Sequence, residues 1–425
     1  MTNLNRLRKL TGRGVEFIDP ASTYIADDVD PERIEPGVKI YGGCRIAGKL
    51  TFIGKGTTLG REGPVTIEDC AVGKYVELGG GSFRGSVFLD RSSMGPGAQV
   101  REACLLEEEA NGAHAVGLKQ TILFPFVTLG SLINFCDCLM AGGTSRRHHS
   151  EVGSSYVHFN FSPNQDKATP SLIGDVPRGV MLDQQPIFLG GQGGLVGPTR
   201  IGFGSVVAAG IVCRADFGEN VLVAGVRQQA KETRYRAGVY PEIKRRVQNN
   251  IHYIANLVAL RSWYAYVRSQ LLDPAVFQAA IAVLNRALAE RVSRLKALAE
   301  QMPESVKGLK GLKIAGIQTV IGQEREFHAA WPSLEELLDG VSEGNGQGGS
   351  LEKRGRDEPD PNAADETLRD GFLQRLMTIT VNDYLSFIRA LDVETKQKGT
   401  EWLSSIVRTI ERAALSFLPS FRGKS

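Results

Sequence analysis

The sequence predicts a mostly β protein with an added α part, in which a parallel β-helix of hexapeptide repeats is followed by a C-terminal helical module. A small aliphatic residue returns every six positions in the first half of the chain, and Gly, Pro, Asp and small polar residues fill the positions between. The repeat is clearest at Ile34, Ile40 and Ile46, at Met94, Val100 and Leu106, and at Leu195, Ile201 and Val207. Each hexad then forms one strand and one turn, and three hexads form a triangular coil with its aliphatic residues inside.

The composition is that of a folded protein with more than one structural unit. The chain has 425 residues, of which 42% are hydrophobic, and its 49 glycines suit the tight corners of a solenoid. The net charge of +3 is too small to indicate a nucleic-acid partner or an anionic membrane surface. The six cysteines lack metal-site spacing and are expected to be buried thiols, with no metal. Because we find neither a secretory signal nor a run of 18 apolar residues, we expect a cytoplasmic protein without a membrane segment.

The first half of the chain divides into an arm and a solenoid. Residues 1–14 are expected to form a short basic helix or arm, and residues 15–226 the β-helix. Two segments interrupt the six-residue repeat, from Glu107 to Phe126 and from Gly142 to Gly174. A solenoid accommodates insertions at its corners, and such insertions commonly build the binding face. We therefore expect the chemistry of the β-helix at these two interruptions.

The second half changes to helical spacing. Apolar residues recur at intervals of three and four between Pro241 and Met302, which predicts a helical module of long antiparallel helices over residues 227–341. Asp273 is the expected N-cap of one helix, with Pro274 in its first position. Residues 342–364 have almost no aliphatic side chains and predict a disordered linker. Residues 365–425 are expected to hold two C-terminal helices, at about 365–391 and 395–418.

Three segments of the first half resemble one enzyme family. These are GVEFIDPASTYIADDV from Gly14, FNFSPNQDKATPSLIGD from Phe159 and GENVLVAGVRQQAKETRYR from Gly218. They are similar to the hexapeptide-repeat acetyltransferase domain of the bifunctional UDP-N-acetylglucosamine pyrophosphorylase and glucosamine-1-phosphate N-acetyltransferase, over about residues 15–236. The resemblance implies a left-handed β-helix and a homotrimer. It also implies acetyl-CoA as a co-substrate bound between neighbouring prisms, with a sugar phosphate or nucleotide sugar as acceptor.

The resemblance assigns the first group of candidate site residues. The family holds the sugar phosphate with an Arg and a Lys eighteen positions apart, and Arg101 and Lys119 match this spacing. Its catalytic His, twelve positions after the Lys, is replaced here by Ser131. A family Tyr three positions later is replaced by Asn134. The phosphate clamp therefore matches the family, whereas the catalytic base does not.

A second group follows farther along the chain. The family's Asn-Tyr pair becomes Asn160 and Phe161, and a family Lys that contacts substrate or cofactor matches Lys167 if one residue is inserted. These three residues are expected to bind substrate. Arg227 and Arg236 belong to a basic segment after the last coil, which resembles the family's exit arm. They are expected to grip the 3′-phosphate of CoA, or alternatively to lie on a solvated helix face.

The replaced catalytic base requires another proton acceptor, because a serine hydroxyl cannot accept a proton at neutral pH without a base beside it. His158 is the candidate, since it lies two residues before Asn160 and would point to the same side of a strand. The alternative is a structural histidine with satisfied hydrogen bonds. His148 and His149 favour a solvated polar loop or an anion-binding loop, and His114 favours a corner residue.

These observations leave three hypotheses for the function. The first is an acyl-CoA-dependent N-acyltransferase that acts on an amino-sugar phosphate or nucleotide sugar. The second is a non-catalytic sugar-nucleotide-binding protein that recruits a protein partner through its C-terminal helices. The third is a structural scaffold. The family's nucleotidyltransferase domain has no match in the sequence. A name of the UDP-N-acetylglucosamine pyrophosphorylase type would therefore rest on homology of the β-helix alone.

Overall fold

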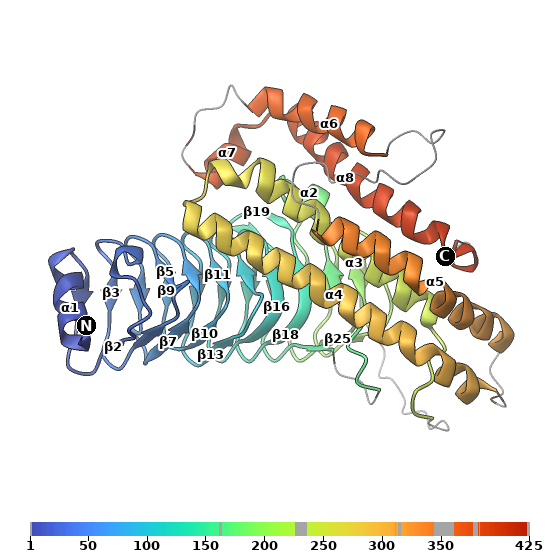
Figure 1. Cartoon of the computed structure of the whole chain (residues 1–425), viewed down its shortest axis with the longest axis horizontal. Coiled ribbons are helices and arrows are strands. Elements are labelled where there is room, and N and C mark those ends of the chain that lie inside the picture. Colours follow the sequence, from blue (N-terminus) through green and yellow to red (C-terminus); the bar gives the residue numbers. More distant parts are fainter. Residues whose placement is uncertain are drawn as a thin grey trace.

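The computed structural model of the chain (Figure 1) describes residues 2–160, 164–225, 236–310, 312, 316–343, 361–376, 381 and 383–422. The first half is a parallel β-solenoid, and long helices lie along one side of it. The predicted fold class, a hexapeptide-repeat β-helix followed by helices, is therefore confirmed. None of the described helices is both long and apolar enough to cross a lipid bilayer.

Each coil contributes strands to three faces of the solenoid. Face 1 is a sheet of eleven described strands, whereas faces 2 and 3 form one sixteen-stranded sheet that bends at the corner between them. The strands of face 1 are β1 (Glu16–Phe17), β3 (Lys39–Ile40), β6 (Thr58–Leu59), β9 (Glu77–Leu78), β12 (Ser93–Met94), β15 (Asn111–Gly112), β17 (Thr128–Leu129), β21 (Glu151–Val152), β24 (Phe188–Leu189), β27 (Val206–Val207) and β29 (Leu222–Val223).

Two long strands join faces 2 and 3, because β16 (Gly117–Leu123) and β18 (Asn134–Met140) run through the corner between them. The other strands of face 2 are β2 (Tyr24–Ile25), β4 (Arg45–Ala47), β7 (Val65–Glu68), β10 (Gly81–Arg84), β13 (Ala98–Val100), β22 (Val157–Phe159), β25 (Gly194–Val196) and β28 (Val212–Cys213). The other strands of face 3 are β5 (Phe52–Ile53), β8 (Ala71–Val72), β11 (Val87–Phe88), β14 (Leu105–Leu106), β23 (Ser171–Ile173) and β26 (Arg200–Ile201).

The six-residue repeat supplies the interior of the solenoid. All nine repeat residues named above are buried, with Ile40, Leu106 and Leu195 among those that are fully inaccessible. Each buried aliphatic side chain contributes roughly 1.5–3 kcal/mol relative to an exposed one. Helix α1 (Asn3–Gly12), in the segment where a helix or arm is expected, packs Leu7 and Leu10 against this core.

Face 3 is buried on its outer side as well. Helices α3 (Ile243–Tyr266) and α4 (Pro274–Leu309) lie against it, with α4 contacting β8 and β11 and α3 contacting β23. The outward residues of this face are therefore apolar and buried: Phe52, Ala71, Val87, Leu105, Ile122, Leu139 and Leu172. Consecutive apolar residues in its strands follow from burial on both sides. The other described helices are α2 (Val176–Gly179), α5 (Ile317–Glu343), α6 (Pro361–Leu376), α7 (Tyr384–Ala390) and α8 (Val393–Ser416), with 3₁₀ turns at Pro31–Arg33, Arg268–Gln270 and Pro419–Phe421.

Buried polar contacts also join the helices to the solenoid. Arg268, which follows α3, is fully buried and forms an ion pair of 2.9 Å with Glu108. The hydroxyl of Tyr264 in α3 donates a hydrogen bond of 2.5 Å to Glu107. Burial raises the pKa of Glu107 to about 7, although Arg268 opposes the shift. Since Glu107 and Glu108 occupy a corner of the solenoid, these contacts fix the helices to it.

The structure revises three expectations about the elements. Residues Glu107 to Phe126 are not an insertion, because they continue the regular coils after β14 and contain β15 and β16, which pair with the strands of neighbouring coils. The helix expected at 365–391 is two helices, since α6 ends at Leu376 and Asp383 caps α7 by accepting from the Ser386 N–H. The linker expected at 342–364 falls largely outside the described residues. The N-cap at Asp273 is confirmed, because its carboxylate accepts a hydrogen bond of 2.8 Å from the Ala275 N–H.

Candidate functional site

The two predicted phosphate-binding residues lie next to each other on the outer side of face 2. Val100 pairs with Leu118, so the following residues, Arg101 and Lys119, occupy adjacent rungs about 4.8 Å apart. The spacing of eighteen residues is thus one coil of the solenoid. Arg101 is exposed and Lys119 is half-buried. Two cations that stack in this way form a surface for an anionic group.

Asn134 and Cys136 continue this surface on the next rung. Lys119 pairs with Cys136 in the ladder, and Asn134 is exposed two residues before it on the same side. A guanidinium nitrogen of Arg101 donates to the Cys136 sulfur at 3.8 Å. Burial raises the pKa of the Cys136 thiol, which therefore remains protonated at neutral pH. The structure thus brings Arg101, Lys119 and Asn134 together on one face.

Ser131, which stands where the family has its catalytic His, contacts another histidine. The Ser131 hydroxyl oxygen lies 2.8 Å from Nδ1 of His114. Both residues sit at the corner between faces 1 and 2 in successive coils, and the Leu132 N–H donates to the His114 carbonyl. When Nδ1 carries no proton, the hydroxyl donates to it. His114 was expected to be only a corner residue. Its separation of seventeen residues from Ser131 equals the local coil repeat, in which Asn111 pairs with Thr128.

The position of His158 argues against its predicted role as catalytic base. His158 pairs with Leu195 on the inward side of face 2 and is only 2% exposed. One ring nitrogen contacts the Cys136 carbonyl, and the other lies 2.7 Å from the Ser171 hydroxyl. Burial lowers the pKa of His158 to about 4. Both nitrogens are therefore engaged inside the solenoid and away from a substrate on its surface.

The buried His158 should make the protein sensitive to acid. Its pKa is about 4 in the folded chain and about 6.5 in an unfolded one, so only the unfolded state takes up this proton between those values. The contribution of His158 to the free energy of unfolding is therefore fully present above pH 6.5. It is lost as the pH is lowered to 4, and the loss is roughly 3 kcal/mol. Urea unfolding at pH 7 and pH 4.5 should show a smaller loss for His158→Gln than for the unmodified protein. Equal losses would contradict this assignment.

The pair His148 and His149 belongs to a different corner. They form β20, which pairs with β19 (Gly143–Ser145) in a hairpin between faces 3 and 1. Arg146 anchors the hairpin, because its guanidinium donates to the Glu109 carbonyl at 2.7 Å and to the Thr128 hydroxyl. This hairpin lies at the start of the second predicted interruption, which runs from Gly142 to Gly174. It does not join Arg101 and Lys119, which lie on face 2.

The remaining predicted residues belong to a segment that folds back onto α4. Asn160 donates a hydrogen bond of 2.9 Å to Asp137, whose other oxygen lies 2.8 Å from the guanidinium of Arg291 in α4. Arg291 also reaches the Lys167 carbonyl at 3.4 Å. The Asn160 side chain is therefore engaged by the buried pair of Asp137 and Arg291, which argues against direct contact with a substrate. Lys167 is half-buried beside it.

The predicted cofactor residues do not join this surface. Arg236 is exposed and donates to the Gly308 carbonyl near the end of α4. Phe161 and Arg227 lie outside the described residues. No group of His, Cys, Asp and Glu side chains that could hold a metal ion occurs within the described part of the chain.

Comparison with known proteins gives relatives for part of the chain. No family model matches. The chain is 29% identical over 231 residues to the bifunctional protein GlmU of Thermotoga maritima, covering 54% of this chain and 46% of that protein. It is 30% identical over 236 residues to GlmU of Acinetobacter baumannii strain AYE, covering 54% and 45%. The chain therefore spans about half the length of the curated relatives it matches.

A solved structure gives a loose likeness. This is the UDP-N-acetylglucosamine acyltransferase from Campylobacter jejuni, at 11% identity and a TM-score of 0.19. The match covers 73% of this chain and 93% of that one. The sequence relatives fit the acetyltransferase-like β-helix expected over about residues 15–236, and they support a hexapeptide-repeat acyltransferase-like protein in general terms.

Proposed function

We propose that the β-helix transfers an acyl group from acyl-CoA to the amino group of a sugar phosphate or nucleotide sugar. The observation that carries this proposal is the composition of face 2. Arg101 and Lys119 occupy adjacent rungs on it, Asn134 lies beside them, and the Ser131 and His114 pair stands at its edge. Acyl transfer to an amine needs cations for the phosphate and a base for the proton, and these residues supply both.

The proposed reaction is a direct attack on the thioester. Arg101 and Lys119 hold the phosphate, and the amine nitrogen forms a bond to the thioester carbonyl carbon. The amine proton passes to the Ser131 hydroxyl oxygen, while the hydroxyl's own proton moves to Nδ1 of His114. The carbon–sulfur bond breaks, and CoA leaves as a thiol after taking a proton from the imidazolium. His114 thus replaces the family base through a serine relay.

Thiol release from acetyl-CoA tests this function. Purified protein should release thiol with glucosamine-1-phosphate or a UDP-linked amino sugar. Lys119→Met should lower kcat/KM about 10- to 100-fold, mostly through KM, because it removes one charged contact to the phosphate. Lys55→Met, at an exposed corner residue outside face 2, serves as the control and should have no effect. Absence of thiol release with every acceptor would refute the proposal.

A second candidate is a sugar-nucleotide-binding protein without catalysis. Ser131 stands in place of the family's catalytic His, and Asn160 is engaged by Asp137, which favours this alternative. In that case the helices would bind a protein partner. Calorimetric binding of a sugar nucleotide without thiol release would support this second function over the first.

We also propose that the protein assembles as a homotrimer, as the resemblance implies. Three exposed apolar residues lie on successive rungs of face 1, since Phe188 pairs with Val206 and Val206 with Leu222. They are 41%, 40% and 71% exposed. An apolar row of this kind supports contact between copies of the chain.

A further inference from the structure

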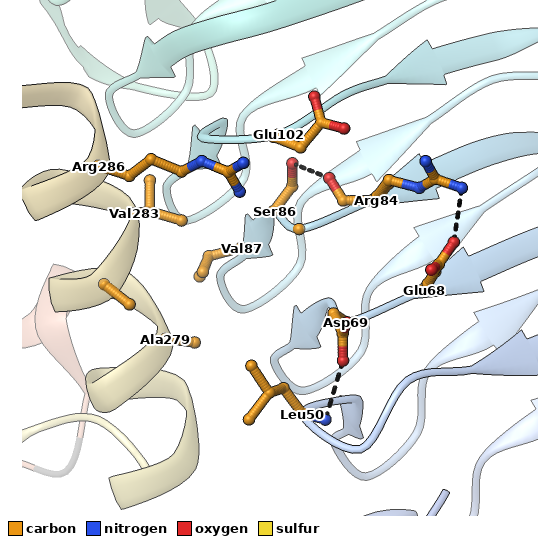
Figure 2. A pocket seen from close by; sticks show the side chains of 12 residues that line it. Leu50, Glu68, Asp69, Arg84, Ser86, Val87, Glu102, Ala279, Val283 and Arg286 are labelled. Atoms are coloured by element: carbon orange, nitrogen blue, oxygen red, sulfur yellow. Dashed lines mark hydrogen bonds and ion pairs between the residues drawn. The ribbon is translucent and has the colours of Figure 1, made fainter. Parts of the chain in front are cut away.

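A groove runs between helix α4 and the corner that joins faces 2 and 3. Two cavities of about 330 and 410 Å³ form it, and they adjoin because both are lined by Glu102 and Arg286. Figure 2 shows one of them, with Ala279, Val283 and Arg286 of α4 facing the solenoid. The solenoid wall is built by five successive coils, at Leu50, Asp69, Ser86, Glu102 and Lys119. At ~4.8 Å per coil the groove is about 19 Å long.

One end of the groove is cationic and lies beside the proposed phosphate clamp. Lys119 belongs to both, and Arg286 faces the groove from α4. Within the described part of the chain, neither side chain has an ion-pair partner, whereas Arg294 is paired with Glu290 at 2.8 Å. Of the two carboxylates that line this end, Glu290 is the partner of Arg294, and Glu102 has no ion-pair partner among the residues that the structure describes. With Arg101 on the next rung, this end has an excess of positive charge that suits an anion.

The other end of the groove is largely apolar. Leu50 and Val87 of the solenoid face Ala279 and Val283 of α4. Leu50 is 58% exposed, which is unusual for an aliphatic residue beside a packed helix. The acidic residues at this end are already engaged, because Glu68 pairs with Arg84 at 2.7 Å and Asp69 accepts from the Leu50 N–H. This end therefore suits a flat, weakly polar group such as a nucleoside.

Small residues of α4 keep the groove open. Ala282 and Ala289 are exposed, although both line its wall. A larger side chain at either position would point into the groove and leave the buried side of the helix unchanged. The helix has no counterpart in the family resemblance, which ends at about residue 236. The groove is therefore a feature that the helical module adds to the solenoid.

We propose that this groove binds the nucleoside diphosphate part of a substrate, with the diphosphate between Lys119 and Arg286 and the nucleoside between Leu50, Val87 and Val283. This inference rests on the proposed function, since it places part of the acyl acceptor or of the acyl donor in the groove next to the phosphate clamp of Arg101 and Lys119. Two substrates contain the required group, a nucleotide sugar and CoA itself. The volume of each cavity lies within the usual range for ligand pockets.

Calorimetry with UDP and with CoA tests the groove and distinguishes the two sources. The ligand that uses the groove should bind to the full chain, and Arg286→Met should weaken it about 10- to 100-fold by removing a charged contact. Ala282→Phe should weaken it comparably by filling the groove. Gln278→Phe is the matched control, because Gln278 is exposed on the same helix but does not line the groove. Thermal unfolding should be similar for the two phenylalanine variants.

The outcomes separate this inference from the proposed function. Binding of UDP or CoA that is lost in Ala282→Phe and kept in Gln278→Phe supports the groove, even if no thiol is released. The inference is overturned if neither ligand binds, or if both phenylalanine variants bind equally well. Thiol release from acetyl-CoA with glucosamine-1-phosphate, measured on the unmodified protein, tests the acyl transfer with an acceptor that contains no nucleoside.

Discussion

Arg291→Met should lower the free energy of unfolding by about 3–5 kcal/mol. Arg291 is 2% exposed, and its guanidinium lies 2.8 Å from a carboxylate oxygen of Asp137, which is 5% exposed. Removing one partner of a buried ion pair leaves the other charge uncompensated in a medium of low polarity, and this cost exceeds the value of the pair itself. Asp137 would also lose the group that orients it toward Asn160. Urea unfolding followed by circular dichroism measures the change.

A neighbouring residue provides the control for this experiment. Arg294 lies one turn farther along α4 and forms an ion pair of 2.8 Å with Glu290, but both side chains are about one third exposed. An exposed ion pair contributes about 0–1 kcal/mol, so Arg294→Met should have little effect. The double variant Arg291→Met with Asp137→Leu should recover part of the loss, because it removes the orphaned charge. Equal stability of Arg291→Met and Arg294→Met would contradict the interpretation.

The interior of the solenoid was predictable because it depends on local pattern. Each inward position needs an apolar residue whatever its neighbour is, so a six-residue repeat at Ile40, Val100 and Ile201 is sufficient to predict coils. The same pattern failed at Glu107 and Glu108. These carboxylates interrupt the repeat, yet the coil is regular there, because Tyr264 and Arg268 satisfy them from far along the sequence. A local pattern contains no information about such distant partners.

The covering of face 3 by helices has a signal in the sequence of its strands. Its strands carry two apolar residues in succession, as in Phe52–Ile53 and Val87–Phe88, whereas strands of face 1 such as Lys39–Ile40 alternate polar and apolar residues. Successive apolar residues indicate burial on both sides of a sheet. Because the helices of the second half were also predicted, the sequence was sufficient in principle to predict that they pack on face 3.

The candidate site was predictable only where its spacing equals the coil. Arg101 and Lys119 are one coil apart, and the structure brings them together. His158 was assigned to the wrong side of face 2, because alternation gives the relative direction of side chains but not which set faces inward. The contact between His114 and Ser131 was missed, since the repeat at that corner is seventeen residues rather than eighteen.

His114→Ala should lower kcat for acyl transfer by about 10²- to 10⁴-fold, the usual contribution of a positioned general base. The imidazole lies 2.8 Å from the Ser131 hydroxyl, and without it the hydroxyl cannot pass on the amine proton. The loss should appear in kcat with KM little changed, because the imidazole moves a proton and does not hold the phosphate, and steady-state thiol release measures both constants. His148→Ala serves as the control, because His148 is exposed on the hairpin between faces 3 and 1.

The double variant His114→Ala with Ser131→His gives the sharpest test of this relay. It moves the imidazole to position 131, where the family that this chain resembles carries its own base. This position lies on the coil that follows the coil of His114. If His114 acts by accepting the proton that Ser131 receives, the double variant should recover a large part of the lost kcat. A merely structural role for His114 predicts no recovery, because the new histidine cannot restore a packing contact at the old corner. Steady-state thiol release from pH 5.5 to 9 distinguishes the two outcomes.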